Sequence, residues 1–269
     1  MIDIAIQIVN YNTKKYLVNC LAGVISDLND SSISYKILVA DNASQDDLRD
    51  LEEKYRDVAF YYSQKNTGFG VGHNFLAKKA ESKYILILNP DLKFLEPRTV
   101  ERLFSYIEKG IKDRIAVVGP KLLNTKGVQI WDHGVQDGAF AWFVNKIGGS
   151  HWRNDKEGKN VAWVSGGVFM ILREVFNQIS GFDENFFLYK EEEDLCLRLR
   201  NKGYKIMYLP DIKVFHYGSV VASKDKFFDV SNKYFLEKHF GGKGLITYLV
   251  ISIFNKLKHK FLNKIIYPK

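Results

Sequence analysis

The chain has 269 residues, of which 46% are hydrophobic and 26% charged, a globular composition that argues against disorder. The formal net charge is +8, but six lysines and no acidic residue fall between Lys243 and Lys269, so most of the excess lies at the end of the chain. No recognisable nucleic-acid-binding module accompanies this charge, and we expect no nucleic-acid partner. The two cysteines, Cys20 and Cys196, lie among apolar residues, which argues against a disulfide framework or a cysteine metal cluster.

The sequence predicts no membrane-spanning segment. Residues 1–5 contain neither a basic start nor a small-residue cleavage site. The longest uncharged stretch, 244–255, is shorter than the roughly 20 residues that a spanning helix requires. We therefore expect a cytoplasmic protein.

The first half of the chain alternates between two hydrophobic periodicities. Short apolar runs predict buried strands at 4–9, 37–40, 58–62 and 84–88. Apolar residues at helical spacing predict helices over 16–28 and around 100–107. This alternation predicts an α/β fold with a mostly parallel central sheet flanked by helices.

The second half has a different pattern, which we interpret as a further part of the same domain. Residues 126–163 are loop-rich and carry Trp131, Trp142, Trp152 and Trp163, whose rings suit either sugar binding or core packing. A glycine pair follows at 166–167, and a helical pattern then runs through 191–201 and ends near Gly203.

Polar side chains follow each of the predicted parallel strands. In such sheets ligands bind where the carboxyl ends of the strands meet the loops. Each residue alone is ordinary turn chemistry, but four loops at one edge together indicate a ligand site. The residues are Asn10 and Asn12 after the first strand, Asp41 after the second, Asn66 to Asn74 after the third, and Asn89 and Asp91 after the fourth.

Six motifs occur in a recognisable order: Val9 to Asn12, Val39 to Ser44, Asn66 to Asn74, Leu88 to Asp91, Gly181 to Tyr189, and Glu191 to Cys196. In this order they resemble the inverting family 2 glycosyltransferases, most closely the rhamnosyltransferase-like and galactofuranosyltransferase-like branch, over roughly residues 3–240. The resemblance implies the GT-A fold and a nucleotide-sugar donor, a dTDP- or UDP-sugar with rhamnose as one candidate. The implied acceptor is a hydroxyl of a cell-surface glycan precursor, free or lipid-linked.

Asp91 and His216 are the expected metal ligands. A departing nucleoside diphosphate develops negative charge, so the site needs a cation beside the phosphates. Asp91 can supply a hard oxygen ligand for Mg²⁺ or Mn²⁺, and the resemblance makes it the metal-binding acid. We expect its carboxylate to face the surface of its loop. By resemblance His216 lies near the metal, and Asn89 replaces an acid that the family often has.

The acidic run 191–194 carries the expected general base. Charge alone would predict a solvated helix start. The run resembles the family's Glu-Asp-x-Asp motif, in which the second acid takes the proton from the acceptor hydroxyl. That position is Glu192, where Glu replaces the usual Asp, and Glu191 is the rival base. Asp194 and Gly166 are expected on the acceptor side.

The remaining candidates are expected to bind the donor. By resemblance Asp41 accepts a hydrogen bond from a pyrimidine ring, although capping the next helix is the alternative. Gly68 lies in a glycine-rich run that lets the backbone approach a ligand closely. The other expected donor-binding residues are Asn10, Asn12, Asn66, Asn74 and Asn89.

Two other functions stay open. A sugar nucleotidyltransferase would need a glycine-rich basic loop after the first strand, but residues 10–15 contain no glycine. A carbohydrate-binding pseudoenzyme would explain the unusual residues at Asn89 and Glu192.

We expect a catalytic domain over 1–240, with a nucleotide-sugar side over 1–125 and an acceptor side over 126–240. A basic amphipathic helical tail follows over 241–269. Its apolar stripe and lysines suit peripheral contact with an anionic membrane at the inner face. Packing on the catalytic domain, or pairing in a homodimer, would explain the stripe equally well.

Overall fold

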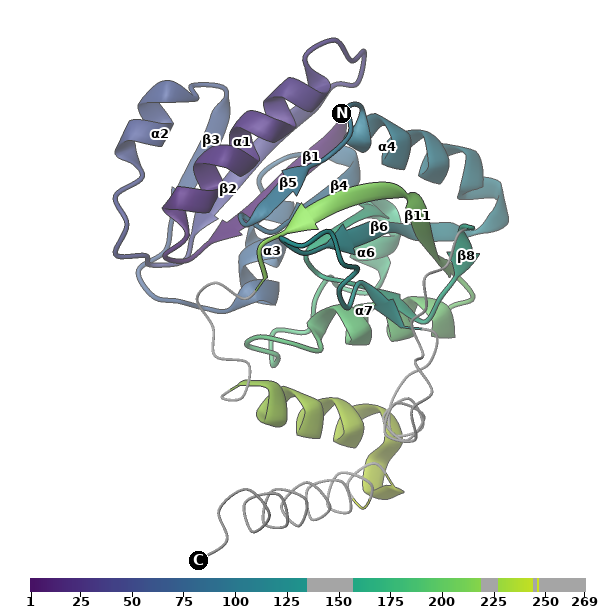
Figure 1. Cartoon of the computed structure of the whole chain (residues 1–269). Helices are drawn as coiled ribbons and strands as arrows, with labels where there is room; N and C mark the ends of the chain where they lie inside the picture. The colour runs from purple at the N-terminus through teal and green to yellow at the C-terminus, as the bar shows by residue number, and fades with distance from the viewer. Residues whose placement is uncertain (135–156, 219–226, 244–245, 247–269) are drawn as a thin grey trace, which may run out of the picture.

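The computed structural model describes residues 1–134, 157–218, 227–243 and 246. Its centre is a nine-stranded sheet in the order β3-β2-β1-β4-β10-β6-β11-β5, with β8 paired to β11 (Figure 1). The strands are β1 (Ile2–Asn10), β2 (Tyr35–Asp41), β3 (Val58–Tyr62), β4 (Ser82–Leu88), β5 (Leu92–Phe94), β6 (Ile115–Leu123), β8 (Lys159–Asn160), β10 (Val168–Leu172) and β11 (Lys205–His216). A separate two-stranded sheet pairs β7 (His133–Gly134) with β9 (Trp163–Val164).

Helices cover both faces of the central sheet. They are α1 (Lys14–Leu28), α2 (Arg49–Lys54), α3 (Phe69–Ala77), α4 (Thr99–Gly110), α6 (Arg173–Gln178) and α7 (Glu191–Asn201), with a short 3-10 helix at Ile111–Asp113 and a further helix over residues 227–243. Buried apolar residues of α1, α2 and α4 pack on one face of the sheet. Those of α3, α6 and α7 pack on the other, which completes a three-layer α/β/α arrangement.

The predicted mostly parallel sheet with flanking helices is confirmed. β1 pairs in parallel with both β2 and β4, and β2 pairs in parallel with β3. The strand predicted at 58–62 has the same bounds in the structure, and the others extend by one to three residues. Helices cover both faces of these strands, so most of their side chains are buried. This is why the strands appear in the sequence as continuous apolar runs.

The second half adds strands to this sheet. β10 enters between β4 and β6 and is antiparallel to both. β11 lies parallel to β6, and its last residues pair with β5 in an antiparallel ladder. Because β10 runs opposite to β4, the start of β10 lies at the same sheet edge as the end of β4.

Helix 227–243 lies beyond the sheet, on the side of α7 (Figure 1). The predicted domain boundary at residue 240 falls within this helix. Of the predicted tail, residues 244–245 and 247–269 lie outside the described residues, as do Trp142 and Trp152. Among the helices that the structure describes, none is long and apolar enough to cross a membrane.

Candidate active site

A cavity of about 610 Å³ opens at the sheet edge where β1 and β4 end and β10 begins. It brings together eight of the residues predicted from the sequence: Asn66, Gly68, Asn89, Asp91, Gly166, Glu191, Glu192 and His216. Parallel strands direct their carboxyl-end loops to one edge, which explains why residues far apart in the sequence meet here.

Asp91 and His216 face each other in this cavity. Nε2 of His216 lies 3.2 Å from Oδ1 of Asp91. The sheet produces this contact, because Leu92, the first residue of β5, pairs with His216 at the end of β11. Asp91 is only 6% exposed, so the expectation that it faces the surface of its loop is wrong. The two residues that follow β11 contact it: the Tyr217 N–H donates to its carbonyl oxygen at 3.0 Å, and the Gly218 N–H donates to its Oδ2 at 3.1 Å.

The chemistry of this pair fits a divalent cation. Within the described part of the chain, the buried Nδ1 of His216 has no hydrogen-bond partner, and the buried Nε2 has only its contact with Oδ1 of Asp91. An imidazole nitrogen that lies beside a carboxylate oxygen in this way is suited to bind a metal ion together with it. The described residues contain no cluster of three or more His, Cys, Asp or Glu side chains around this point. Two protein ligands would leave the remaining positions to phosphate oxygens and water, as is usual for Mg²⁺.

Glu191 and Glu192 enter the cavity from the first turn of α7. Glu191 is 4% exposed, and its Oε2 has no hydrogen-bond partner among the described residues. Burial, reinforced by the neighbouring Glu192, holds the pKa of Glu191 well above its usual range. Burial, followed by the charge of Glu193, raises the pKa of Glu192 to about 7. A carboxyl group with a pKa near neutrality is suited to proton transfer at physiological pH.

The turn before α7 has an unusual backbone. Tyr189 and Lys190 both have φ of 73°, although neither is a glycine. Such residues cost on the order of 1–3 kcal/mol each and persist only where the surrounding structure holds them. Lys190 precedes Glu191 directly, so this turn determines how the two glutamates enter the cavity.

Two glycines provide close packing beside these acids. Gly68 has φ of 89°, and a Cβ there would lie 2.3 Å from the carbonyl oxygen of Phe187. Only glycine both adopts this positive φ without strain and leaves room for the Phe187 carbonyl oxygen. A Cβ on Gly166 would lie 3.6 Å from Cβ and Cδ of Glu192, so this glycine lies directly against the expected base.

A buried polar network lies beneath the nucleotide-sugar side. Nδ2 of Asn10 donates to Oδ1 of Asp41 at 2.8 Å, and Oδ1 of Asn10 accepts from Thr13 at 2.6 Å. Asp41 also accepts bonds from the backbone and hydroxyl of Ser44. Asn12, with φ of 52°, accepts a bond from the Gln45 N–H. Asn10, Asn12 and Asp41 therefore organise the loops around the cavity and do not line its wall.

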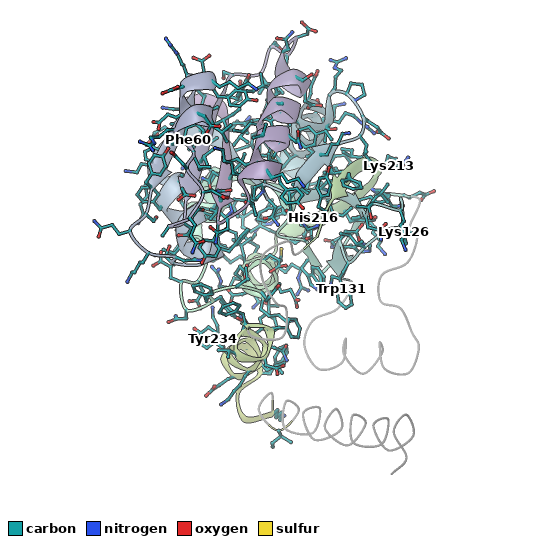
Figure 2. All side chains as sticks on the ribbon, turned by 60° about the vertical axis from the view of Figure 1, so that its left-hand side comes forward. Phe60, Lys126, Trp131, Lys213, His216 and Tyr234 are labelled. Atoms are coloured by element: carbon teal, nitrogen blue, oxygen red, sulfur yellow. The ribbon has the colours of Figure 1, made fainter. Side chains whose placement is uncertain are left out.

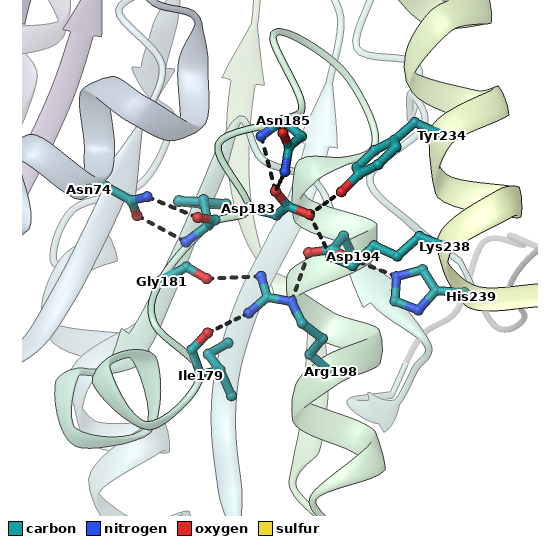
Figure 3. A network of polar contacts seen from close by, with 11 residues as sticks. Asn74, Ile179, Gly181, Asp183, Asn185, Asp194, Arg198, Tyr234, Lys238 and His239 are labelled. Atoms are coloured by element: carbon teal, nitrogen blue, oxygen red, sulfur yellow. Dashed lines mark hydrogen bonds and ion pairs between the residues drawn. The ribbon is translucent and has the colours of Figure 1, made fainter.

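Asn74 and Asp194 also lie away from the cavity wall. Nδ2 of Asn74 donates to the carbonyl of Phe182 and to Glu184, so it connects α3 to the loop before α7. Asp194 is fully buried and contacts the cationic side chains of Arg198 and Lys238 and the imidazole of His239 (Figure 3).

Several lining residues had not been assigned a role from the sequence. Asn42, next to Asp41 in a quoted motif, donates to Oδ1 of Asn66 and to the Gly68 carbonyl, each at 3.0 Å. The motif Val39 to Ser44, which contains Asn42, could have identified this residue as part of the site. Phe227 lines the cavity from helix 227–243, and its ring lies 4.8 Å from that of Phe187. No sequence pattern connects Phe227 to the site. In Figure 2, His216 is near the centre of the view, with Phe60 of β3 above it and Tyr234 of helix 227–243 below it.

Two of the tryptophans from the aromatic stretch are described. Trp131 and Trp163 stack on each other, with ring centroids 5.9 Å apart. Trp163 is 3% exposed, which assigns it to packing. Neither residue lines the cavity.

A protein-family model described as Glycosyl transferase family 2 matches residues 5–180, more than half of the chain. The chain is a family 2 glycosyltransferase. A second model, described as the N-terminal domain of galactosyltransferase, matches residues 150–221 of this glycosyltransferase.

Three relatives of this glycosyltransferase are named as rhamnosyltransferases or hexosyltransferases. It is 27% identical over 231 residues to rhamnosyltransferase WbbL of Escherichia coli K12, covering 79% of this chain and 82% of that protein. It is 23% identical over 262 residues to low-salt glycan biosynthesis hexosyltransferase Agl10 of Haloferax volcanii, covering 93% and 81%. It is 24% identical over 213 residues to N-acetylglucosaminyl-diphospho-decaprenol L-rhamnosyltransferase of Mycobacterium tuberculosis, covering 70% and 68%.

Solved structures share the fold of this glycosyltransferase. GalNAc-T7 with UDP, GalNAc and Mn²⁺ matches with a TM-score of 0.62 at 17% identity, covering 80% of this chain and 44% of that one. Residues 1–349 of S. aureus TarS in complex with UDP match with a TM-score of 0.60 at 14% identity, covering 87% and 64%. Together with the family match, these likenesses confirm the expected GT-A fold.

Proposed function

We propose that this enzyme is an inverting glycosyltransferase that moves a sugar from a nucleoside-diphosphate donor to a hydroxyl of a glycan precursor, with Glu192 as general base. The observation that carries the proposal is the cavity itself. It holds a carboxyl group with a pKa near neutrality and, in the same space, the facing pair Asp91 and His216. These are the proton acceptor and the cation ligands that such a transfer requires.

The reaction balances with one carboxylate as proton acceptor. The acceptor oxygen forms a bond to the anomeric carbon, and the bond from that carbon to the phosphate oxygen breaks. The electron pair leaves with the nucleoside diphosphate, and the acceptor proton goes to Glu192. Attack on the face opposite the phosphate inverts the anomeric configuration.

The environments of the two glutamates favour Glu192 as the base. Glu191 lies deeper, and burial together with the neighbouring Glu192 raises its pKa, which favours its protonated form. Glu192 is partly exposed and ionises at a pKa of about 7. A pair of acids whose pKa values are pushed apart usually divides in this way between a protonated group and a base.

Asp91 and His216 would hold Mg²⁺ or Mn²⁺. The bound cation would neutralise the charge that develops on the diphosphate. The structure of GalNAc-T7, which contains UDP and Mn²⁺, supports the use of a divalent metal on this fold. Asn66, Gly68 and Asn89 line the same cavity and would contact the donor, while the network of Asn10, Asn12 and Asp41 would hold the nucleotide loops in place.

Aromatic residues would form the acceptor side. Phe187, Tyr189 and Phe227 line the same cavity as the two glutamates. Aromatic rings pack well against the apolar faces of sugars. Gly166 would let an acceptor approach Glu192, whereas Asn74 and Asp194 support the loop and helix that carry these groups.

The decisive experiment uses the full chain with Mn²⁺ and a donor panel of dTDP-rhamnose and common UDP-sugars. The acceptor probe is N-acetylglucosaminyl-diphospho-decaprenol, chosen from the name of the mycobacterial relative. We expect release of nucleoside diphosphate together with a glycosylated lipid of inverted configuration. A Glu192→Gln variant should bind the donor and lose transfer by about 10²- to 10⁴-fold.

The same experiment separates the competing functions. Donor binding without turnover in the wild type would favour a carbohydrate-binding pseudoenzyme. Formation of a nucleotide sugar from a nucleoside triphosphate and a sugar phosphate would favour a nucleotidyltransferase. Retained configuration, or full activity of Glu192→Gln, would contradict the proposed mechanism.

A further inference from the structure

Helix 227–243 lies outside both segments that match family models, residues 5–180 and 150–221. It nevertheless contacts the segment 183–194, which leads into α7 and contains both cavity glutamates. Figure 3 shows the contacts at the two ends of the segment, and a further contact lies at its middle.

One side chain of the helix joins the two ends. Nζ of Lys238 lies 2.6 Å from Oδ2 of Asp183 and 2.5 Å from Oδ1 of Asp194. Tyr234 donates to the same oxygen of Asp183 at 2.9 Å, and Nε2 of His239 lies 2.7 Å from Oδ1 of Asp194. The lysine therefore bridges the two carboxylates at the opposite ends of the segment 183–194.

The middle of the segment is held by the same helix. The Ser231 hydroxyl donates to the carbonyl of Leu188 at 2.8 Å. Nζ of Lys190 lies 5.4 Å from the ring centroid of Phe228 and 5.5 Å from that of Phe235, within the range of a cation–π contact. These contacts lie on both sides of Tyr189.

The segment needs such support because its turn is strained. Tyr189 and Lys190 both adopt positive φ immediately before Glu191. If the turn relaxed, the first turn of α7 would rotate or fray, and the two glutamates would change position. A displacement of about 1 Å can reduce the rate of an enzyme about 100-fold.

We propose that helix 227–243 is a positioning element of the active site, and that Lys238 is its principal residue. By holding Asp183 and Asp194 together, Lys238 keeps the strained turn in place and directs Glu191 and Glu192 into the cavity. Phe227, at the start of the same helix, couples this support to the cavity wall. The inference rests on the proposed function, because it assigns the glutamates a part in transfer.

The charges around Asp194 make Lys238 a suitable test position. Burial alone would raise the pKa of Asp194, but bonds from His239, Arg198 and Lys238 outweigh burial and lower this pKa. Without Lys238, Asp194 retains Arg198 at 2.7 Å and His239 at 2.7 Å. The buried carboxylate thus keeps its ion pair with Arg198 and its contact with His239, and the connection to Asp183 is the specific loss.

The experiment compares three variants of the full chain: Lys238→Met, Lys238→Arg, and Lys233→Met as a matched control on an exposed position of the same helix. For each, we would measure kcat for transfer from whichever donor of the panel the wild type uses, the Kd for the corresponding nucleoside diphosphate, and Tm. We expect Lys238→Met to lower kcat about 10- to 100-fold with Kd changed less than about 2-fold. Lys238→Arg should restore most of kcat, and Lys233→Met should behave as wild type.

Hydrogen exchange gives a second readout that needs no activity. Backbone amides of 188–194 should exchange faster in Lys238→Met, while those of β1 and β4 stay protected. Unchanged exchange in this segment would overturn the proposal, as would wild-type kcat in Lys238→Met. A fall in kcat that only follows the unfolded fraction would also overturn it. If the wild type transfers no sugar, the proposed function fails, and the exchange result alone decides whether the helix holds the turn.

Discussion

Replacing Glu192 by Gln should stabilise the protein at alkaline pH while it removes transfer. The folded state raises the pKa of Glu192 from 4.5 to about 7. Between these two values the folded state keeps a proton that the unfolded state releases, so the free energy of unfolding falls as pH rises from about 4.5 through 7. The loss is complete above pH 7.

The size of the effect follows from the shift. A difference of about 2.5 pKa units corresponds to about 3 kcal/mol of stability lost by the wild type at pH 8. Gln cannot ionise and has nearly the same shape, so Glu192→Gln should recover this free energy. At about 2–4 °C per kcal/mol for a chain of this size, Tm at pH 8 should rise by roughly 6–12 °C. At pH 4 the variant and the wild type should have similar stability.

Urea unfolding followed by circular dichroism at pH 4 and pH 8 measures this difference. Glu237→Gln, an exposed glutamate of helix 227–243, is the control and should change the free energy of unfolding by less than about 0.5 kcal/mol at both pH values. A gain of equal size at pH 4 and pH 8 would mean that burial of the charged form is not the cause. No gain at pH 8 would refute the assignment of a raised pKa to this side chain.

Three further predictions concern the same site. In the wild type, transfer should increase about 100-fold between pH 5 and pH 8 as Glu192 ionises, and a flat pH–rate profile would exclude it as the base. Asp91→Asn should lower Mn²⁺-dependent transfer roughly 100-fold, whereas the exposed Asp211→Asn should not; equal rates with and without chelator in the wild type would remove the metal from the mechanism. Gly68→Ala should destabilise the fold by more than about 2 kcal/mol in urea titrations, because it combines a positive φ with a close carbonyl oxygen. Gly23→Ala, in open space on α1, should stabilise the fold by about 0.5–1 kcal/mol, so similar effects of the two changes would contradict the geometric argument.

The first half of the fold could be predicted because its signals are local. Apolar runs such as 58–62 and 84–88 fill whole strands, and the polar residues that follow them, including Asp91, lie at the predicted edge. β6, β10 and β11 were not predicted. β10 is a five-residue apolar strand, and neither its position between β4 and β6 nor its antiparallel direction leaves a local pattern.

The site could be predicted in part, because several of its residues lie in or next to local sequence motifs. The last motif contained Glu191 and Glu192, the family resemblance added His216, and all three residues line the cavity. The contacts of Asp194 could not be read in full from the acidic run, because two of its partners, Lys238 and His239, lie some 45 residues away in sequence. The contribution of Phe227 depends likewise on long-range packing.

The place of β10 in the sheet has a consequence for how the chain is made and handled. Until residues 168–172 have been synthesised, β4 has no partner on the side that β10 will occupy, and its backbone is open to pairing with other chains. The intermediate built from β1 to β4 is thus exposed to aggregation during translation, when incomplete chains present unpaired strand edges. Deletions that remove β10 should yield insoluble protein, while shortening the chain after β11 should spare the sheet. Expression trials should therefore keep residues 168–172 in every fragment.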